Sequence, residues 1–345
     1  MTRIFVYETT SADPGCTDPE LQAQGRSMRA AMVADLAIID GVQVSCAVVE
    51  GGVNGLTEAC RENGPRHLIH ASLHALRVRP VPRPATDAPV DFLRRQAAMH
   101  DLVWVVAPET GDMLGGLCAV VPQNKWLGCS TRAITIATSK RATTSLLRAA
   151  GIPATEPLDR EGLCTTRDKG SWVVKPDDGC GAAGARKHPD HRRALADYAG
   201  RRSRHEQAVM EPWIDGEPLS MSLLCGAGEV EVLAINRQAI SFDESGFLHF
   251  DGATPDAVHG SRAETMDYLA RRIVEAFPGL GGFVGVDVTW HPVRGPVVIE
   301  INPRVTCAYE GLSLRLGRNV AQQMLALHER TQGVASPQAR RVLHH

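Results

Sequence analysis

The chain contains 345 residues, of which 43% are hydrophobic and 22% are charged, and its formal net charge is −2. This composition is typical of a globular protein with a sizeable core, and it excludes wholesale disorder. The near-neutral charge provides no overall attraction to nucleic acid or to an anionic membrane, so we expect neither as a partner. At about 100–200 residues per domain, the length predicts two or three domains.

Cysteine usage and the first residues indicate the compartment. The nine cysteines are scattered from Cys16 to Cys307, and none has the CxxC spacing of a zinc ribbon or a thioredoxin motif. We therefore expect reduced thiols in a cytoplasmic protein. Met1–Val6 resembles a strand rather than a signal peptide, and no apolar run approaches the roughly 18 residues of a membrane helix.

The first third of the chain alternates between strand and helix patterns. In chain order, the expected elements are a strand at Ile4–Glu8, a helix at Arg26–Ile39, a strand at Val42–Val49, a helix at Asp91–His100 and a strand at Leu102–Ala107. This order predicts an α/β domain with an open parallel sheet. The glycines of residues 51–55 do not match the dinucleotide fingerprint and indicate a turn. The proline-rich stretch Arg77–Pro89 predicts a loop.

The rest of the chain changes pattern near residue 125. A helix is expected at Ser139–Ala150, ended by Gly151 and Pro153, and strands dominate from Trp172 onward. A last helix is expected at Asn319–His328. We therefore place domain boundaries at 1–124, 125–205 and 206–330, followed by a polar tail at 331–345.

A glycine-rich segment follows the strand that begins at Trp172. Lys175 ends the strand, and Gly179, Gly181 and Gly184 follow it. Glycines allow backbone N–H groups to surround a phosphate, and a nearby lysine adds charge. The segment is not a Walker A motif, because the lysine precedes the glycines. Taken alone, a glycine-rich segment after a strand is more often an ordinary turn.

The next strand, from Ala208, ends in an acid and enters a short linker. Glu211 is followed by Trp213 and Ile214, and then by Glu217. The backbone of such a linker can hydrogen-bond the edge of an adenine, and Glu211 can accept from its amino group. The alternative is an ordinary strand exit with Trp213 in the core.

Three polar residues interrupt an apolar hairpin. Phe283–Trp290 and Pro296–Ile301 are strand-like, and the residues between them favour a turn. If Trp290 faces Val297, then Asp287 faces Glu300 at about 5 Å between Cβ atoms. Asn302 shares the face of Glu300, because side chains alternate along a strand.

These three residues predict a cation site. Two buried carboxylates this close repel, and a divalent cation relieves the repulsion. Mg²⁺ prefers carboxylate, amide and phosphate oxygens, so Asp287, Glu300 and Asn302 are the expected ligands, with Mn²⁺ as the alternative ion. Arg304 follows closely and could stabilise charge on a transferring phosphoryl group. The alternative is a solvent-facing strand with scattered acids.

In order and spacing, Lys140, Lys175, the glycine segment, Glu211 and the Asp287–Asn302 group resemble the ATP-grasp superfamily over about residues 125–315. The resemblance implies an ATP-grasp fold with an N-terminal Rossmann-like pre-ATP-grasp domain at 1–124. It also implies a central subdomain with a glycine-rich lid at 125–205 and a C-terminal subdomain with the adenine and metal sites at 206–330.

The resemblance also implies a role for each matching residue. Lys140 and Lys175 would hold the phosphates of ATP, the glycines Gly179, Gly181 and Gly184 would cover them, Glu211, Trp213 and Ile214 would hold adenine, and Glu217 is the candidate for the ribose. Asp287, Glu300 and Asn302 would bind Mg²⁺. We expect Arg304 and Arg237 to hold the phosphoryl group and the substrate carboxylate.

Five stretches resemble the tyramine–glutamate ligase group of methanofuran biosynthesis and its methylofuran counterparts in one-carbon metabolism. They are Ala107–Thr110, Gly128–Ser130, Lys175–Gly184, Ile235–Gln238 and Glu300–Thr306. This resemblance implies a ligase that joins L-glutamate to tyramine or tyrosine, both small molecules, through an acyl-phosphate. Apart from the resemblance, a homodimer is the candidate assembly.

Two alternatives stay open at this stage. One is another ATP-grasp amino-acid or dipeptide ligase, and the other is a regulatory protein that binds ATP without turnover. Two further pairs are candidates for substrate contact: Tyr7 and Glu8 at a strand end, and Tyr309 and Glu310 after the metal strand.

Overall fold

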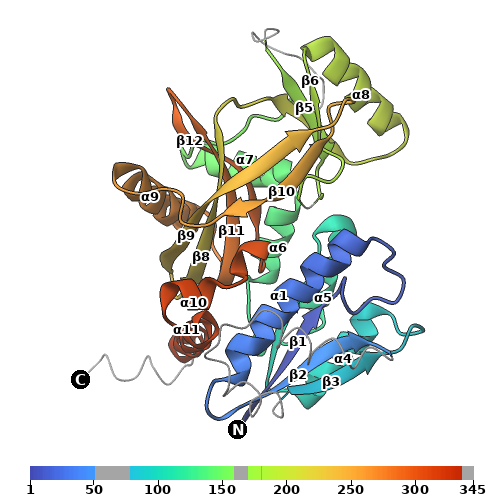
Figure 1. Ribbon diagram of the computed structural model, residues 1–345, viewed down its shortest axis with the longest axis vertical. Coiled ribbons are helices and arrows are strands. Elements are labelled where there is room, and N and C mark those ends of the chain that lie inside the picture. Colours follow the sequence, from blue (N-terminus) through green and yellow to red (C-terminus); the bar gives the residue numbers. More distant parts are fainter. Residues whose placement is uncertain (51–77, 159–169, 180, 336–345) are drawn as a thin grey trace.

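The computed structural model describes residues 1–50, 78–158, 170–179 and 181–335, and contains three sheets (Figure 1). A four-stranded sheet is built from the N-terminal part of the chain, a three-stranded sheet from the middle, and a five-stranded sheet from the C-terminal part. In Figure 1 the small sheet with helix α8 lies at the top, the N-terminal sheet lies at the bottom, and the large sheet stands between them.

The N-terminal sheet is parallel throughout, with the order β3-β2-β1-β4. Its strands are β1 (Thr2–Glu8), β2 (Val42–Val49), β3 (Val78–Arg83) and β4 (Leu102–Val106), and it is covered by α1 (Pro19–Ala37) and α4 (Pro89–Met99). The nearly continuous apolar strands fit a sheet that is buried on both faces. The predicted α/β alternation is thereby confirmed, although α1 begins well before the expected Arg26.

The prediction of a loop at Arg77–Pro89 is correct for residues 84–88, which form a turn, but wrong for the described residues before them. Residue 77 lies outside the described residues, but Val78–Arg83 forms strand β3, with Pro80 beside Cys46 and Pro82 beside Val48 of β2. Strand β3 is at the edge of the sheet. An edge strand tolerates proline, because the missing N–H group points away from the one neighbouring strand.

Short helices connect this sheet to the rest of the chain. They are η2 (Thr110–Asp112), α5 (Met113–Ala119), α6 (Thr131–Thr138) and α7 (Lys140–Ala149). The side chain of Ser130 caps α6 by accepting from the N–H of Ala133, and that of Ser139 caps α7 by accepting from Ala142. The caps set these starts, and the helix expected at Ser139–Ala150 is confirmed.

The small sheet has the order β6-β5-β7 and is antiparallel. It consists of β5 (Trp172–Pro176), β6 (Arg186–His188) and β7 (Ala208–Pro212), with α8 (His191–Ser203) packed on one face. Trp172, Val174 and Met210 meet Ala194 and Tyr198 of α8 in a separate apolar cluster. The opposite face therefore remains for polar residues.

The large sheet has the order β10-β9-β8-β11-β12 and is also antiparallel. Its strands are β8 (Glu217–Gly226), β9 (Glu229–Phe242), β10 (Leu248–Thr254), β11 (Gly282–His291) and β12 (Gly295–Asn302). One face packs against α6, α7 and α9 (Ser261–Ala276) through residues such as Val286, Val288 and Ile273. Because side chains alternate, the residues between these apolar positions form a second, polar face.

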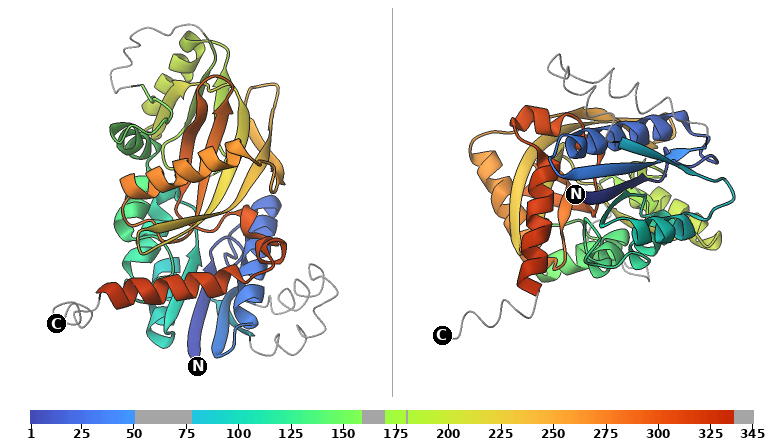
Figure 2. Two further views of the ribbon diagram at one scale, coloured as in Figure 1. Left: turned by 90° about the vertical axis from the view of Figure 1, so that its left-hand side faces the viewer. Right: turned by 90° about the horizontal axis from the view of Figure 1, so that it is seen from below.

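The C-terminal segment ties the N-terminal sheet to the large sheet. It comprises η3 (Cys307–Tyr309), α10 (Leu312–Leu316) and α11 (Val320–Ala335), and Figure 2 shows α11 lying across the end of the large sheet. Asp35 of α1 accepts hydrogen bonds from Tyr309 (2.6 Å) and Ser313 (2.5 Å). Helix α11 continues to Ala335, beyond the expected His328.

Within the described ranges, no helix combines the length and the hydropathy that a membrane span requires.

Candidate functional site

The two predicted metal-binding acids face each other on the central hairpin. Asp287 of β11 pairs with Glu300 of β12, and Asn302 lies two residues further along on the same face. The assumed register was wrong, because Trp290 pairs with Pro296 rather than with Val297. A bulge between Asp287 and Val288 shifts the pairing by one residue and brings the two acids opposite each other.

Polar neighbours hold Asp287 on this face. Its Oδ1 atom accepts from Gln238 Nε2 at 2.9 Å, and its Oδ2 atom accepts from Asn302 Nδ2 at 3.2 Å. Burial and then the charge of Glu300 raise the pKa of Asp287 to about 7. The pair is therefore repulsive, as expected for carboxylates that share a cation.

Lys140 is the cation nearest to Glu300. It is the first residue of α7, it is almost fully buried, and its Nζ atom lies 3.2 Å from Glu300 Oε2. Burial by itself lowers the pKa of Lys140, but the charge of Glu300 and the hydrogen bond that Lys140 donates to it outweigh this effect and raise the pKa. Lys140 also donates to the carbonyl of Gly179, so it links the acid pair to the glycine segment.

Lys175 and Glu211 form a second buried pair on the small sheet. Strands β5 and β7 are neighbours, and Lys175 Nζ lies 2.6 Å from Glu211 Oε1. Both side chains are more than 90% buried. The other carboxylate oxygen of Glu211, Oε2, is buried without a hydrogen-bond partner in the described structure, so it is an open acceptor for a donor brought by a ligand.

The glycine segment begins where β5 ends. Gly181 and Gly184 have φ angles of +60° and +70°, which a residue with a Cβ atom rarely adopts, and Cys180 lies outside the described residues. A Cβ atom on Gly179 would lie 3.0 Å from Pro176 Cβ. The three glycines therefore allow a tight chain reversal beside Lys140.

Trp213 and Ile214 lie in the linker between β7 and β8, as expected, and both are half-buried. The ring of Trp213 packs edge-on against Phe242 at 5.6 Å between ring centroids. Lys187 Nζ lies 4.4 Å from the Trp213 centroid, a cationic neighbour that sequence reasoning missed. Trp213 is thus not a core residue.

Glu217 and Arg237 are not brought to the acid pair. Ser220 of β8 lies opposite Asp287, so Glu217, three residues earlier, is on the other face of the sheet. There its oxygens accept from Arg237 Nε (2.5 Å) and from Arg262 Nη2 of α9 (2.6 Å). Arg237 therefore belongs to an ion-pair cluster on the α9 side, and we remove it from the candidate catalytic residues.

Arg304 does lie beside the acids, and its positive charge lowers the pKa of Asp287. Its Nε and Nη2 atoms donate to Glu109 Oε1 (3.0 Å) and Oε2 (3.1 Å). Glu109 comes from the turn after β4, in the N-terminal part of the chain. We did not single it out from the sequence, although its position after a parallel strand could have indicated it.

Glu8 and Tyr309, one residue from each candidate substrate-contact pair, are buried. Tyr309 is buried against Trp104 and Phe283, so it is a core residue. Glu8 is also buried, and it accepts the backbone N–H groups of Thr10 and Ser11 at 3.0 and 2.6 Å. Neither side chain is presented to solvent.

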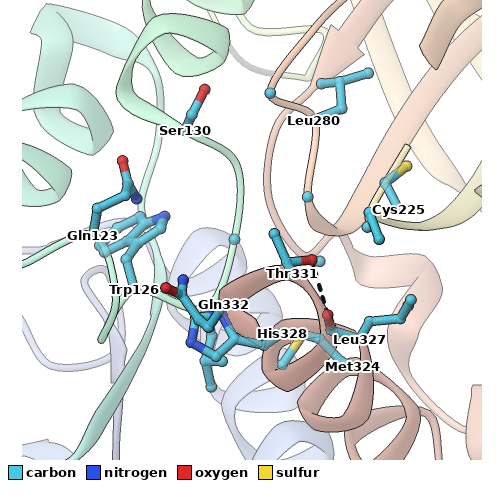
Figure 3. A pocket seen from close by; sticks show the side chains of 17 residues that line it. Gln123, Trp126, Ser130, Cys225, Leu280, Met324, Leu327, His328, Thr331 and Gln332 are labelled. Atoms are coloured by element: carbon cyan, nitrogen blue, oxygen red, sulfur yellow. Dashed lines mark hydrogen bonds between the residues drawn. The ribbon is translucent and has the colours of Figure 1, made fainter. Parts of the chain in front are cut away.

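A separate cavity of about 180 Å³ lies at the far end of the large sheet (Figure 3). Gln123 and Trp126 line it together with Thr331 and Gln332 of α11. It adjoins Gly282, the first residue of β11, whereas Asp287 lies about 17 Å further along the strand at about 3.4 Å per residue. This cavity is therefore distinct from the candidate site.

Comparisons with known proteins agree with this arrangement. Residues 137–308 match the family model described as an ATP-grasp domain, and residues 66–134 match the model described as a pre ATP-grasp 3 domain. No curated protein sequence matches the chain.

Several solved structures are similar in fold. A protein from Archaeoglobus fulgidus assigned to the ATP-grasp superfamily is 20% identical, with a TM-score of 0.64 over 94% of this chain and 88% of its own. An L-amino acid ligase from Bacillus licheniformis is 18% identical (TM-score 0.63; 94% and 73% covered). A D-alanine–D-alanine ligase from Bacillus anthracis is 15% identical (TM-score 0.61; 97% and 100% covered), and this ligase has also been solved with ATP. At these identities the likeness is one of fold.

Proposed function

Because the chain has an ATP-grasp fold preceded by a pre-ATP-grasp domain, we propose that it is an ATP-dependent ligase that joins a carboxylate to an amine. The observation that carries the proposal is the cluster in which Lys140 of α7 and Arg304, just after β12, lie beside the facing acids Asp287 and Glu300. Phosphoryl transfer requires positioning and charge neutralisation more than covalent help from the protein. A cluster of two acids and two cations is suited to both tasks.

The buried cations and the glycine segment support a nucleotide site. We assign Lys140 and Lys175 to the phosphates, and the backbone of Gly179, Gly181 and Gly184 to the same groups. Glu211 has an unpartnered buried oxygen that can accept from the adenine amino group. The half-buried linker residues Trp213 and Ile214 would flank the base.

The acid pair fits Mg²⁺, with Mn²⁺ as the alternative ion. The donor set of Asp287, Glu300 and Asn302 offers two carboxylates and an amide, the groups that Mg²⁺ combines with nucleotide phosphates. The raised pKa of Asp287 is consistent with this assignment, because a bound cation would offset both causes of it, first the burial of the carboxylate and then the charge of Glu300. When bound, the ion would neutralise charge on the β- and γ-phosphates.

The proposed reaction has two steps. A substrate carboxylate oxygen attacks the γ-phosphorus of ATP, the bond between that phosphorus and ADP breaks, and an acyl-phosphate forms. An amine then attacks the acyl carbon, inorganic phosphate leaves with the carbon–oxygen bond electrons, and the nitrogen loses a proton. Arg304 would stabilise the charge that develops on the transferring phosphoryl group.

The finer substrate proposal is L-glutamate with tyramine or tyrosine, in methanofuran- or methylofuran-type biosynthesis. Its support is the resemblance of the five stretches quoted above, among them Ala107–Thr110, which contains Glu109, and Glu300–Thr306, which contains Arg304. A second candidate is the joining of two amino acids, which the similar fold of the Bacillus licheniformis L-amino acid ligase favours.

The test is substrate-dependent ADP release with Mg-ATP, with mass spectrometry of the product. We expect a product mass equal to both substrates less water, from L-glutamate with tyramine or tyrosine. The product should be absent with Glu300→Ala and retained with Asp267→Asn, a matched control whose exposed carboxylate pairs with Arg271 on α9. ADP release only with other acid–amine pairs would keep the ligase and reject the substrate proposal. No ADP release with any pair would reject the ligase itself.

A further inference from the structure

The residue that pairs with Arg304 comes from the N-terminal third of the chain. Glu109 and Arg304 are 195 residues apart in sequence, and both carboxylate oxygens of Glu109 accept hydrogen bonds from the guanidinium. The side chains are only 5% and 12% exposed, respectively. A bidentate hydrogen-bonded pair of this kind fixes the plane of the guanidinium as well as its position.

The turn that carries Glu109 is itself tightly determined. Gly111 and Asp112 both have left-handed φ angles, +64° and +57°, and among the described residues Asp112 is one of four other than glycine with a positive φ. A Cβ atom on Gly115 would lie only 2.1 Å from Asp112 Oδ1. A strained turn persists only where its surroundings hold it in place, and such turns cluster at functional sites.

The same turn also contacts the start of the glycine segment. The N–H of Gly111 donates to Asp178 Oδ2 at 2.9 Å, and Thr110 Oγ1 donates to the carbonyl of Asp178 at 3.3 Å. Asp178 directly precedes Gly179. One turn of the N-terminal domain therefore touches both the residue expected to contact the phosphoryl group and the segment expected to contact the phosphates.

We propose that Glu109 is a positioning residue that acts through Arg304, so that the N-terminal domain aligns the arginine for phosphoryl transfer. The inference rests on the proposed ligase function. Removing the charge of Glu109 should leave ATP binding intact while Arg304 loses its fixed orientation. If Glu109 served only to hold the two domains together, Glu109→Gln would instead lower the stability of the protein. Any effect of that variant on turnover would then be independent of Arg304.

The experiment compares Glu109→Gln, Glu109→Asp, Arg304→Ala and the double variant E109Q/R304A in steady-state ADP release. We expect kcat to fall about 10- to 100-fold for Glu109→Gln and about 100- to 1,000-fold for Arg304→Ala, the range for loss of a charge-stabilising donor. The KM for ATP should stay within about twofold. Because Glu109 acts through Arg304, the double variant should be no slower than Arg304→Ala alone. Glu109→Asp, which keeps the charge, should recover part of the lost rate.

Glu206→Gln is the matched control, because Glu206 pairs with Arg204 at 2.7 Å on the exposed surface. It should leave kcat unchanged. Two results would overturn the positioning role while leaving the ligase in place. One is a fall in kcat for the double variant that equals the product of the two single falls. The other is an effect of Glu109→Gln on KM or on the melting temperature alone. Absence of ADP release from the wild-type protein would overturn the proposed function, and this inference with it.

Discussion

The buried pair Lys175–Glu211 should be costly for stability and necessary for nucleotide binding. We consider Glu211→Ala, which removes one partner, and the double variant Lys175→Met with Glu211→Met, which replaces both by apolar side chains of similar length. Only the single variant should lose stability, although both variants remove the same ion pair.

The magnitude follows from the burial of both groups. Glu211→Ala leaves the ammonium of Lys175 buried with its partner removed, and breaking a buried pair in this way costs about 3–5 kcal/mol. In the intact pair, Glu211 Oε2 already lacks a hydrogen bond, a penalty of about 1–3 kcal/mol. The double variant removes both desolvated charges and this penalty, so its stability should equal that of the wild type or exceed it by about 1–4 kcal/mol.

The assay is urea unfolding followed by circular dichroism, together with calorimetric titration of Mg-ATP. Both variants should lose measurable ATP affinity, whereas only the single variant should lose stability. Glu156→Ala is the control: it breaks the exposed pair with Arg148 and should cost less than about 1 kcal/mol. A double variant as unstable as Glu211→Ala would refute the reasoning, since the pair would then be a net source of stability rather than a ligand site.

Four further predictions concern other contacts in the structure. Gly25→Ala should lower stability by about 1–3 kcal/mol in thermal unfolding, because the new Cβ atom would lie 2.3 Å from the buried Glu8 Oε2. Burial raises the pKa of Asp35, so the folded protein binds this proton more tightly than the unfolded chain, whose Asp pKa is about 3.9. The stability that protonated Asp35 contributes should be fully present below about pH 3.9 and should be lost as the pH rises through the pKa of Asp35 in the folded protein. Melting curves of Asp35→Asn, which has no proton to lose at this position, should not show this pH-dependent loss. Asp287→Asn should raise the melting temperature without Mg²⁺, by removing the repulsion from Glu300, and should lower Mg²⁺-dependent ADP release by at least about 100-fold. Arg237→Ala should keep kcat within about threefold in the same assay, because Arg237 lies on the opposite face of the sheet; a larger loss would return it to the site.

Patterns that depend on one or two neighbouring strands were readable from the sequence. The hairpin and the period of two were enough to place Glu300 and Asn302 on one face with Asp287. The pairing was correct although the assumed register was not, because a bulge compensated for the offset. The end of the helix that begins after Ser139 was readable from Gly151 and Pro153, whereas its cap by the Ser139 side chain is a finding of the structure.

Features that depend on long-range pairing were not readable. The faces of Glu217 and Arg237 follow from the register of β8 with β11 and β9, which no local pattern specifies. The partner of Lys175 follows from the neighbouring positions of β5 and β7. Proline suggested a loop where an edge strand forms, since only the sheet order shows that β3 has a single neighbour.

Glu109 shows the same limit at the level of domains. Its position after a parallel strand indicates at most a site residue, and its pairing with Arg304, 195 residues later in the chain, depends on how the turn after β4 packs.

The most direct test of the central claim follows an oxygen atom. The acid substrate is labelled with ¹⁸O in its carboxylate and incubated with the amine, Mg²⁺ and ATP, and the released inorganic phosphate is analysed by ³¹P NMR. An acyl-phosphate route transfers one carboxylate oxygen to phosphorus, so the account predicts one ¹⁸O atom in each phosphate formed with product. Product formation with unlabelled phosphate, or with the label in AMP, would contradict it.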